Sequence, residues 1–324
     1  MKGYIEQAYQ GLTEGWRYFL GFILIFIIWQ IGSSIQGIFV FLELKKQGLT
    51  ELEITSKLTN FEVLMGTLES NFNFFLLLLG FVFGFAAIFF TVKFIHQLSF
   101  KSLITSRAKI DWKRILFSFG FVAVLVSGST FLEYKLSPEE FVYNFELNRF
   151  LILALIGILL VPIQTTFEEL YFRGYLLQGI GTAFNSRALS LIITSVLFGL
   201  LHVFNPEIGK LGYELLIVYI GTGFLLCIMT LMDEGLELAI GFHAANNLLT
   251  ALLVTSDWTA FQTHSILKYT GEPSLLSNVY IPVFIVYPVI ILIFAKIYKW
   301  NNWKARLFGK VEVPNPDMVE NQNI

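Results

Sequence analysis

The sequence predicts an all-α, polytopic membrane protein with about eight transmembrane helices around a polar intramembrane cavity. The chain of 324 residues is 55% hydrophobic and has a mean hydropathy of +0.67. Only 14% of its residues are charged, against about a quarter in an ordinary soluble domain. Apolar runs long enough to cross a bilayer recur along the chain. A few polar clusters interrupt these runs, and such residues are expensive at bilayer depth unless they face a protein interior or a wet cavity.

Eight apolar segments account for the expected spans, and each has the length or composition of a membrane helix. They are residues 16–40, 73–94, 115–132, 149–171, 188–204, 213–232, 237–255 and 278–298. We interpret residues 1–310 as one transmembrane helical domain, with the polar motifs concentrated between about 145 and 255. The polar, proline-containing segment 311–324 is expected to be a disordered cytoplasmic tail.

The positions of the basic residues predict the orientation of the chain in the membrane. Most of the 22 Lys and Arg residues fall on one side of the expected helices, in clusters from Lys93 to Arg114 and from Lys296 to Lys310. Because cytoplasmic loops are enriched in basic residues, both termini are expected in the cytoplasm. An even number of spans agrees with this. The absence of organelle-targeting signals and the general character of the sequence favour a bacterial inner (cytoplasmic) membrane.

Composition also excludes several kinds of protein. A net charge of −2 with basic residues confined to loops and flanks argues against a nucleic-acid partner. Cys227 is the only cysteine, so neither an intrachain disulfide nor a cysteine-based zinc cluster can form. No Gly-x-Ser-Gly and no mid-span aspartate is present, which makes serine and aspartyl intramembrane protease chemistry unlikely.

The first polar cluster is Glu168-Glu169 with Arg173, at the end of an apolar run. On a helix Glu169 and Arg173 are four residues apart and can pair on one face. Glu168 points about a hundred degrees away and is available to another partner. A carboxylate beside such a pair in a low-dielectric cavity suits a general base. The alternative interpretation is a helix end that reaches the membrane interface.

Two further clusters contain the histidines. His202 follows Phe198 by four residues near the end of one apolar helix, and His243 precedes Asn246 and Asn247 on another. His243 and Asn247 lie one turn apart and can donate together to a developing oxyanion. Taken singly, each cluster also fits interfacial or interhelical hydrogen bonding. The other two histidines, His96 and His264, are expected at the surface.

Taken together, the three clusters resemble the CPBP family (also called Abi), which includes the type II CAAX prenyl proteases and bacteriocin-processing or immunity proteins. The resemblance covers about residues 145–255. It depends on the order Glu-Glu-x-x-x-Arg, Phe-x-x-x-His and His-x-x-x-Asn. The matching residues are Glu168, Glu169, Arg173, Phe198, His202, His243 and Asn247.

The resemblance implies an intramembrane endopeptidase acting on a peptide or protein substrate, such as a lipidated C-terminal tail or a leader peptide. Glu168 and His202 would activate a water molecule, and His243 and Asn247 would hold the oxyanion. The remaining polar and aromatic motif residues would support these four. They are Glu169, Arg173, Phe198 and Asn246.

Two questions stay open at this point: whether the site needs a metal, and whether the protein is an enzyme. Two histidines and a carboxylate can ligate zinc, so a divalent metal, if required, would be held by Glu168, His202 and His243. The His-Glu-x-x-His motif of common zinc proteases is absent, which favours a metal-free glutamate mechanism slightly. A non-catalytic scaffold, an immunity factor or a transporter of the same fold is the alternative to an enzyme.

The predicted spans place His202 at the opposite membrane side from Glu168 and His243. This conflict disappears if the fourth helix continues past Glu168 to about Leu177 and the fifth helix begins deeper in the cytoplasm. A break at Asn205-Pro206 that folds the chain back toward the cavity is the other solution.

Overall fold

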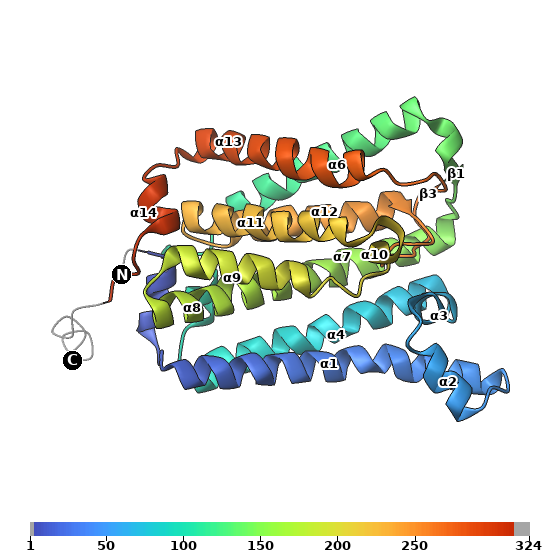
Figure 1. The fold of residues 1–324 in the computed structure, drawn as a ribbon, viewed down its shortest axis with the longest axis horizontal. Coiled ribbons are helices and arrows are strands. Elements are labelled where there is room, and N and C mark those ends of the chain that lie inside the picture. Colours follow the sequence, from blue (N-terminus) through green and yellow to red (C-terminus); the bar gives the residue numbers. More distant parts are fainter. Residues whose placement is uncertain (1–2, 314–324) are drawn as a thin grey trace.

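The computed structural model describes residues 3–313 and confirms an all-α, polytopic membrane protein. Its long helices lie roughly side by side in Figure 1. They are α1 (Gly15–Lys46), α4 (Ser70–Phe90), α6 (Trp112–Leu136), α7 (Leu147–Glu169), α9 (Arg187–Leu200), α11 (Leu216–Asp233), α12 (Glu237–Leu253) and α13 (Tyr287–Tyr298). The predicted tail beyond residue 313 lies outside the described residues.

Six helical stretches in the described part of the chain are long and apolar enough to cross a membrane. They are Gly15–Lys46, Ser70–Ile95, Trp112–Leu136, Leu147–Phe184, Tyr213–Asp233 and Leu276–Tyr298. The segments predicted at 188–204 and 237–255 are helical, as α9 and α12, but have only 14 and 17 residues. The expected number of eight spans is therefore not confirmed, although all eight segments contain helix.

The fourth apolar segment is much longer than its predicted end at residue 171. Helix α7 continues through a π-helical segment, η4 (Leu170–Leu176), into α8 (Leu177–Phe184). The chain reverses at Asn185, which adopts a left-handed conformation with φ of 49°, and Ser186 caps α9. At 1.5 Å per residue, the stretches from Glu168 to the reversal and from there to His202 both measure about 22–24 Å. The two side chains therefore lie at a similar depth, as the first of the two solutions requires.

Helices α12 and α11 occupy the middle of the bundle. Helix α12 packs against α6 and α7, α11 packs against α9, and α4 packs against both α1 and α7. A Cβ atom on Gly241 of α12 would lie 2.2 Å from the carbonyl oxygen of Ile115 in α6. Only glycine allows the two helices to approach so closely. This contact fixes the position of the helix that carries His243.

The short elements gather at the two ends of the bundle (Figure 1). The sheet end carries α2 (Glu51–Lys57), α3 (Phe61–Gly66), η3 (Pro138–Glu140), α10 (Pro206–Leu211), η5 (Tyr213–Leu215) and the strands β1 (Phe141–Tyr143), β2 (Val254–Thr255) and β3 (Leu267–Tyr269). The termini end carries η1 (Ile5–Gln10), α5 (Phe100–Ile104) and α14 (Trp303–Phe308). The π segments η2 (Thr91–Ile95), η6 (Leu276–Tyr280) and η7 (Pro282–Val286) extend α4 and precede α13.

The small sheet was not predicted. Its strand order is β1-β3-β2, with β1 antiparallel and β2 parallel to β3. Phe141 pairs with Tyr269, and Val254 pairs with Leu267. This sheet joins the ends of α6, α7 and α12 outside the helical bundle, so it leaves the all-α class unchanged.

The termini end is tied together by buried polar contacts. Glu6 in η1 accepts two hydrogen bonds of 2.6 Å from Arg187 at the start of α9, and both side chains are almost fully buried. The backbone nitrogen of Val311 donates to the carbonyl of Asn185. Segments from both ends of the chain therefore hold the α8–α9 reversal in place.

Candidate active site

The paired carboxylates lie at the junction of α7 and η4, in the interior of the bundle. Glu169 is fully buried and Glu168 is 7% exposed. Arg173, one turn later and also fully buried, donates from Nη1 to Glu169 Oε1 over 3.0 Å. This is the pair that the spacing of four residues predicts. The alternative of a helix end at the interface does not fit, because the helix continues to Phe184.

The guanidinium of Arg173 also joins the first motif to the second. Its Cζ atom lies 4.0 Å from the ring centroid of Phe198, which is buried in α9. A cation over an aromatic face is attractive, most strongly where water is excluded. Phe198 thus supports the buried charge of Arg173 and at the same time places α9 beside η4.

His243 connects the third motif to both carboxylates. Its Nδ1–H donates to Glu169 Oε1 over 2.7 Å, and its Nε2 lies 3.8 Å from Glu168 Oε2. The contact with Glu169 fixes the ring orientation, as carboxylates do for functional histidines elsewhere. The gap of 3.8 Å is too long for a hydrogen bond, and a small reacting molecule can bridge it.

His202 is held by three contacts that leave one ring nitrogen free for chemistry. Nδ1–H donates to the Phe198 carbonyl over 2.7 Å, so neutral His202 has its lone pair on Nε2. The ring lies between Phe198, at 4.7 Å, and Tyr219 of α11, at 4.3 Å and nearly parallel. Phe198 also contacts the ring of His243 at 6.1 Å. Both imidazoles therefore share one aromatic neighbour.

Asn247 reaches the site through a residue outside the predicted set. Its Nδ2 donates to Gln164 Oε1 over 3.2 Å, and Gln164 Nε2 donates to Glu168 Oε1 over 2.6 Å. Asn246 is exposed and donates to Asn247 Oδ1 over 3.1 Å. The site thus consists of two hydrogen-bonded groups that face each other across the 3.8 Å gap. One joins His243, Glu169 and Arg173, and the other joins Glu168, Gln164 and the two asparagines.

Residues 147–249 match the model of a protein family described as type II CAAX prenyl endopeptidase, Rce1-like. This segment, about a third of the chain, is therefore similar to the Rce1-like family. It contains every motif residue that the sequence singles out, so the family resemblance is confirmed.

Of the curated proteins, "Uncharacterized protein YyaK" of Bacillus subtilis (strain 168) is 33% identical over 200 residues, which are 61% of this chain and 64% of that protein. The chain thus aligns with slightly less than two thirds of this relative. No solved structure matches this chain.

Two residues of the Rce1-like segment escaped the sequence analysis. Gln164 is buried and joins Glu168 to Asn247, while Tyr219 stacks on His202. Gln164 precedes Glu168 by four residues, a spacing that signals a shared helix face. Tyr219 carries no signal of this kind, because its partner lies on another helix.

The expected surface position of His96 is wrong. His96 is 2% exposed, and its Nδ1–H donates to the Leu12 carbonyl over 2.7 Å while Nε2 accepts from the Tyr175 hydroxyl over 2.9 Å. Burial lowers its pKa, which agrees with a neutral ring that packs against α1. His264 pairs with Glu69 at 2.8 Å near the sheet end. Neither histidine joins the site.

Glu168, His202 and His243 do not converge on a common point as metal ligands would. Among residues 3–313, no group of three His, Cys, Asp or Glu side chains converges as metal ligands. Glu168 and His243 approach each other, but His202 does not complete a ligand set with them. The metal ligands expected from the sequence are therefore not assembled here, and no chemical step is assigned to a metal.

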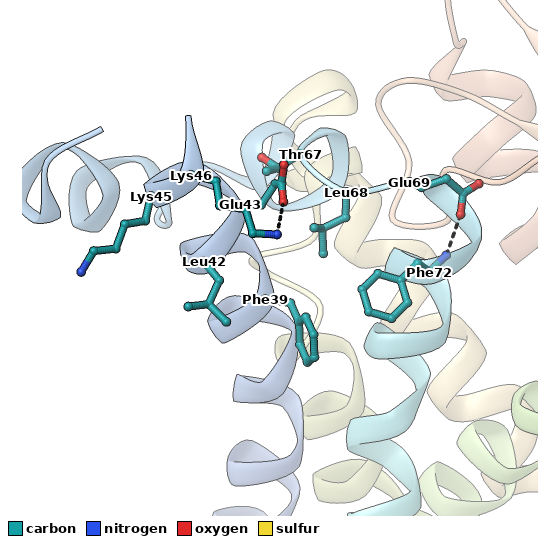
Figure 2. A pocket seen from close by; sticks show the side chains of 9 residues that line it. All are labelled: Phe39, Leu42, Glu43, Lys45, Lys46, Thr67, Leu68, Glu69 and Phe72. Carbon is teal, nitrogen blue, oxygen red and sulfur yellow. Dashed lines mark hydrogen bonds and ion pairs between the residues drawn. The ribbon is translucent and has the colours of Figure 1, made fainter. Parts of the chain in front are cut away.

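A large open hollow lies away from these residues, at the sheet end. Its volume is about 750 Å³, and Phe39, Leu42 and Phe72 form its apolar wall. Figure 2 shows Glu43 and Lys46 paired at its rim and Glu69 accepting from the backbone of Phe72. It contains no side chain from the motifs. We therefore assign no catalytic role to this hollow.

Proposed function

We propose that the protein is a membrane-embedded endopeptidase that hydrolyses a peptide bond with a water molecule activated by Glu168. The observation that carries the proposal is the opposition of Glu168 Oε2 and His243 Nε2 across 3.8 Å. At this separation Glu168 Oε2 can accept from a water molecule while His243 Nε2 faces the carbonyl oxygen that the water attacks. The match of residues 147–249 to an endopeptidase family model supports the same chemistry.

Glu168 is the general base in this mechanism. Gln164 occupies its Oε1, which leaves Oε2 directed toward the gap. Oε2 accepts a proton from water as the water oxygen bonds to the scissile carbonyl carbon. When the C–N bond breaks, Glu168 returns this proton to the leaving amine nitrogen, so the residue is regenerated.

The histidines and Asn247 act on the two oxygens of the reaction. His202 Nε2, free because Nδ1 is bonded to the Phe198 carbonyl, orients the attacking water. His243, as an imidazolium, and Asn247 donate N–H groups to the carbonyl oxygen as its negative charge develops. Glu169 and Arg173 do not touch substrate, and they hold the His243 ring through its Nδ1.

The substrate is a peptide or protein that enters the bilayer, with a lipidated C-terminal tail or a leader peptide as the candidate classes. We place the protein in a bacterial inner (cytoplasmic) membrane with both termini in the cytoplasm. The bacterial relative supports a bacterial membrane, and the basic residues at the termini end support the orientation.

The test compares the membrane peptidome of cells that express the wild type or Glu168→Gln at equal levels. Glutamine fills the same space but cannot accept the proton, so a set of peptide fragments is expected to disappear while the protein folds normally. Glu62→Gln, an exposed substitution at the sheet end, is the matched control and should leave the fragments unchanged. A fully active Glu168→Gln protein would refute the assignment.

Two further experiments distinguish this mechanism from a non-catalytic protein and from a metal-dependent enzyme. If the protein is a scaffold or an immunity factor, Glu168→Ala and His243→Ala should keep the cellular function that is lost when the protein is deleted. Chelation of the purified protein followed by addition of zinc tests the metal-dependent version. Activity that disappears with chelation and returns with zinc would place the metal in the mechanism.

A further inference from the structure

Four side chains form a chain of hydrogen bonds that ends on the proposed base. Asn246 donates to Asn247 over 3.1 Å, Asn247 donates to Gln164 over 3.2 Å, and Gln164 donates to Glu168 over 2.6 Å. The chain crosses from α12 to α7, two helices in direct contact. It passes from an exposed amide into the buried site.

The carboxylate at the end sets the direction of the whole chain. An ionised Glu168 can only accept hydrogen bonds, so Gln164 must present its NH₂ group to it. The Gln164 oxygen then faces Asn247, which must present its own NH₂ group in turn. Each amide therefore has one possible orientation, and all three dipoles point their positive ends toward the carboxylate. Hydrogen bonds in such a chain strengthen one another.

This arrangement leaves Asn247 with a single free N–H. One hydrogen of its NH₂ group is used by Gln164, and its oxygen accepts from Asn246. With both ends of the amide held, the remaining N–H has a fixed direction. In the proposed mechanism this N–H is the donor to the oxyanion.

We propose that Gln164 is a positioning residue that orients the base and the oxyanion donor at once. The inference rests on the proposed function and extends it to a residue outside the three motifs. Gln164 is 5% exposed and acts through Glu168 and Asn247 without touching the substrate. Because Gln164 and Glu168 lie one turn apart on α7, the same helix face fixes the distance between them.

The test replaces Gln164 by Met, which has a similar length but forms neither hydrogen bond. Activity is measured on a synthetic peptide copied from a cleavage site that the Glu168→Gln comparison identifies. We expect kcat to fall about 10- to 100-fold, as for other residues that orient catalytic groups, with KM little changed. The double variant Gln164→Met/Asn247→Ala should lose much less than the product of the two single losses, because both substitutions remove the same ordered donor.

Gln178→Met is the matched control. Gln178 is fully buried at the end of the same helical run and also makes two hydrogen bonds, to the carbonyls of Tyr4 and Ser102. It should lower the melting temperature at least as much as Gln164→Met without lowering kcat of the folded protein. If Gln164→Met keeps full kcat while Glu168→Gln is inactive, the positioning role is wrong and the proposed function stands. Equal losses of kcat in Gln164→Met and Gln178→Met would assign Gln164 a structural role only.

Discussion

At the scale of single residues, His202 is oriented by Phe198 on the preceding helix and by Tyr219 on another helix. Its backbone contact to Phe198 fixes the ring nitrogen that is free, while the stack on Tyr219 fixes the plane of the ring. The Tyr219 hydroxyl accepts from Asn205 over 3.2 Å, so Tyr219 is itself anchored to the segment that follows His202. The imidazole is therefore presented to the site in one orientation.

Two substitutions distinguish the contribution of the Tyr219 ring from that of its hydroxyl. Tyr219→Phe keeps the stack and should retain nearly full activity. Tyr219→Leu removes it and should lower kcat about 2- to 10-fold, the range that corresponds to one aromatic contact of 0.5–1.5 kcal/mol. The rates are compared on the same peptide at equal amounts of folded protein. Equal rates for the two variants would show that the stack does not position His202.

The residues that were predictable from sequence share one property, which is local spacing. Glu169 and Arg173 pair because they are four residues apart, and the motif pattern marks Glu168, His202 and His243. Tyr219 was not predictable, since an aromatic residue within an apolar helix is ordinary. Its partner lies on another helix and only the packing of α9 against α11 brings the two together.

At the scale of elements, the decisive feature is the continuous helix from Leu147 to Phe184. The sequence predicted an end near residue 171, where apolar residues give way to Arg173 and glycine. The helix continues because Arg173 is neutralised inside the bundle by Glu169. The π segment in this region has no sequence marker, although such segments often occur at functional sites. Helix ends of this kind depend on tertiary partners that hydropathy does not record.

The close approach of α12 to α6 provides the prediction at this scale. Gly241→Ala introduces a Cβ atom 2.2 Å from the Ile115 carbonyl oxygen, and the two helices must separate. We expect a loss of about 1–3 kcal/mol of stability, as for other overpacked sites, and a lower melting temperature in detergent. Gly120→Ala on α6 is the control, because nothing lies within 4 Å of its added Cβ. Equal melting temperatures for the two variants would contradict the observed contact.

At the scale of the whole molecule, the acidic turn between α11 and α12 bears on the orientation in the membrane. Asp233 and Glu237 lie in a stretch with no basic residue, which conflicts with a cytoplasmic loop if only local sequence is considered. Arg107 pairs with both, at 2.9 Å and 3.1 Å, and Arg114 pairs with Asp233. These arginines come from the basic segment that the sequence assigns to the cytoplasm. The turn therefore belongs to the same, basic side as that segment.

The two ends of the bundle give this orientation a direct test. Lys57 in α2 and Lys304 in α14 are both exposed and lie at opposite ends of the molecule (Figure 1). Cys227 is fully buried and can be replaced by Ala to give a background without cysteine. In intact cells, a membrane-impermeant maleimide should label Lys57→Cys, whereas Lys304→Cys should react only after the membrane is opened. The reverse pattern would place the termini outside the cell, and the candidate site would then have to receive its water and its substrate from the opposite side.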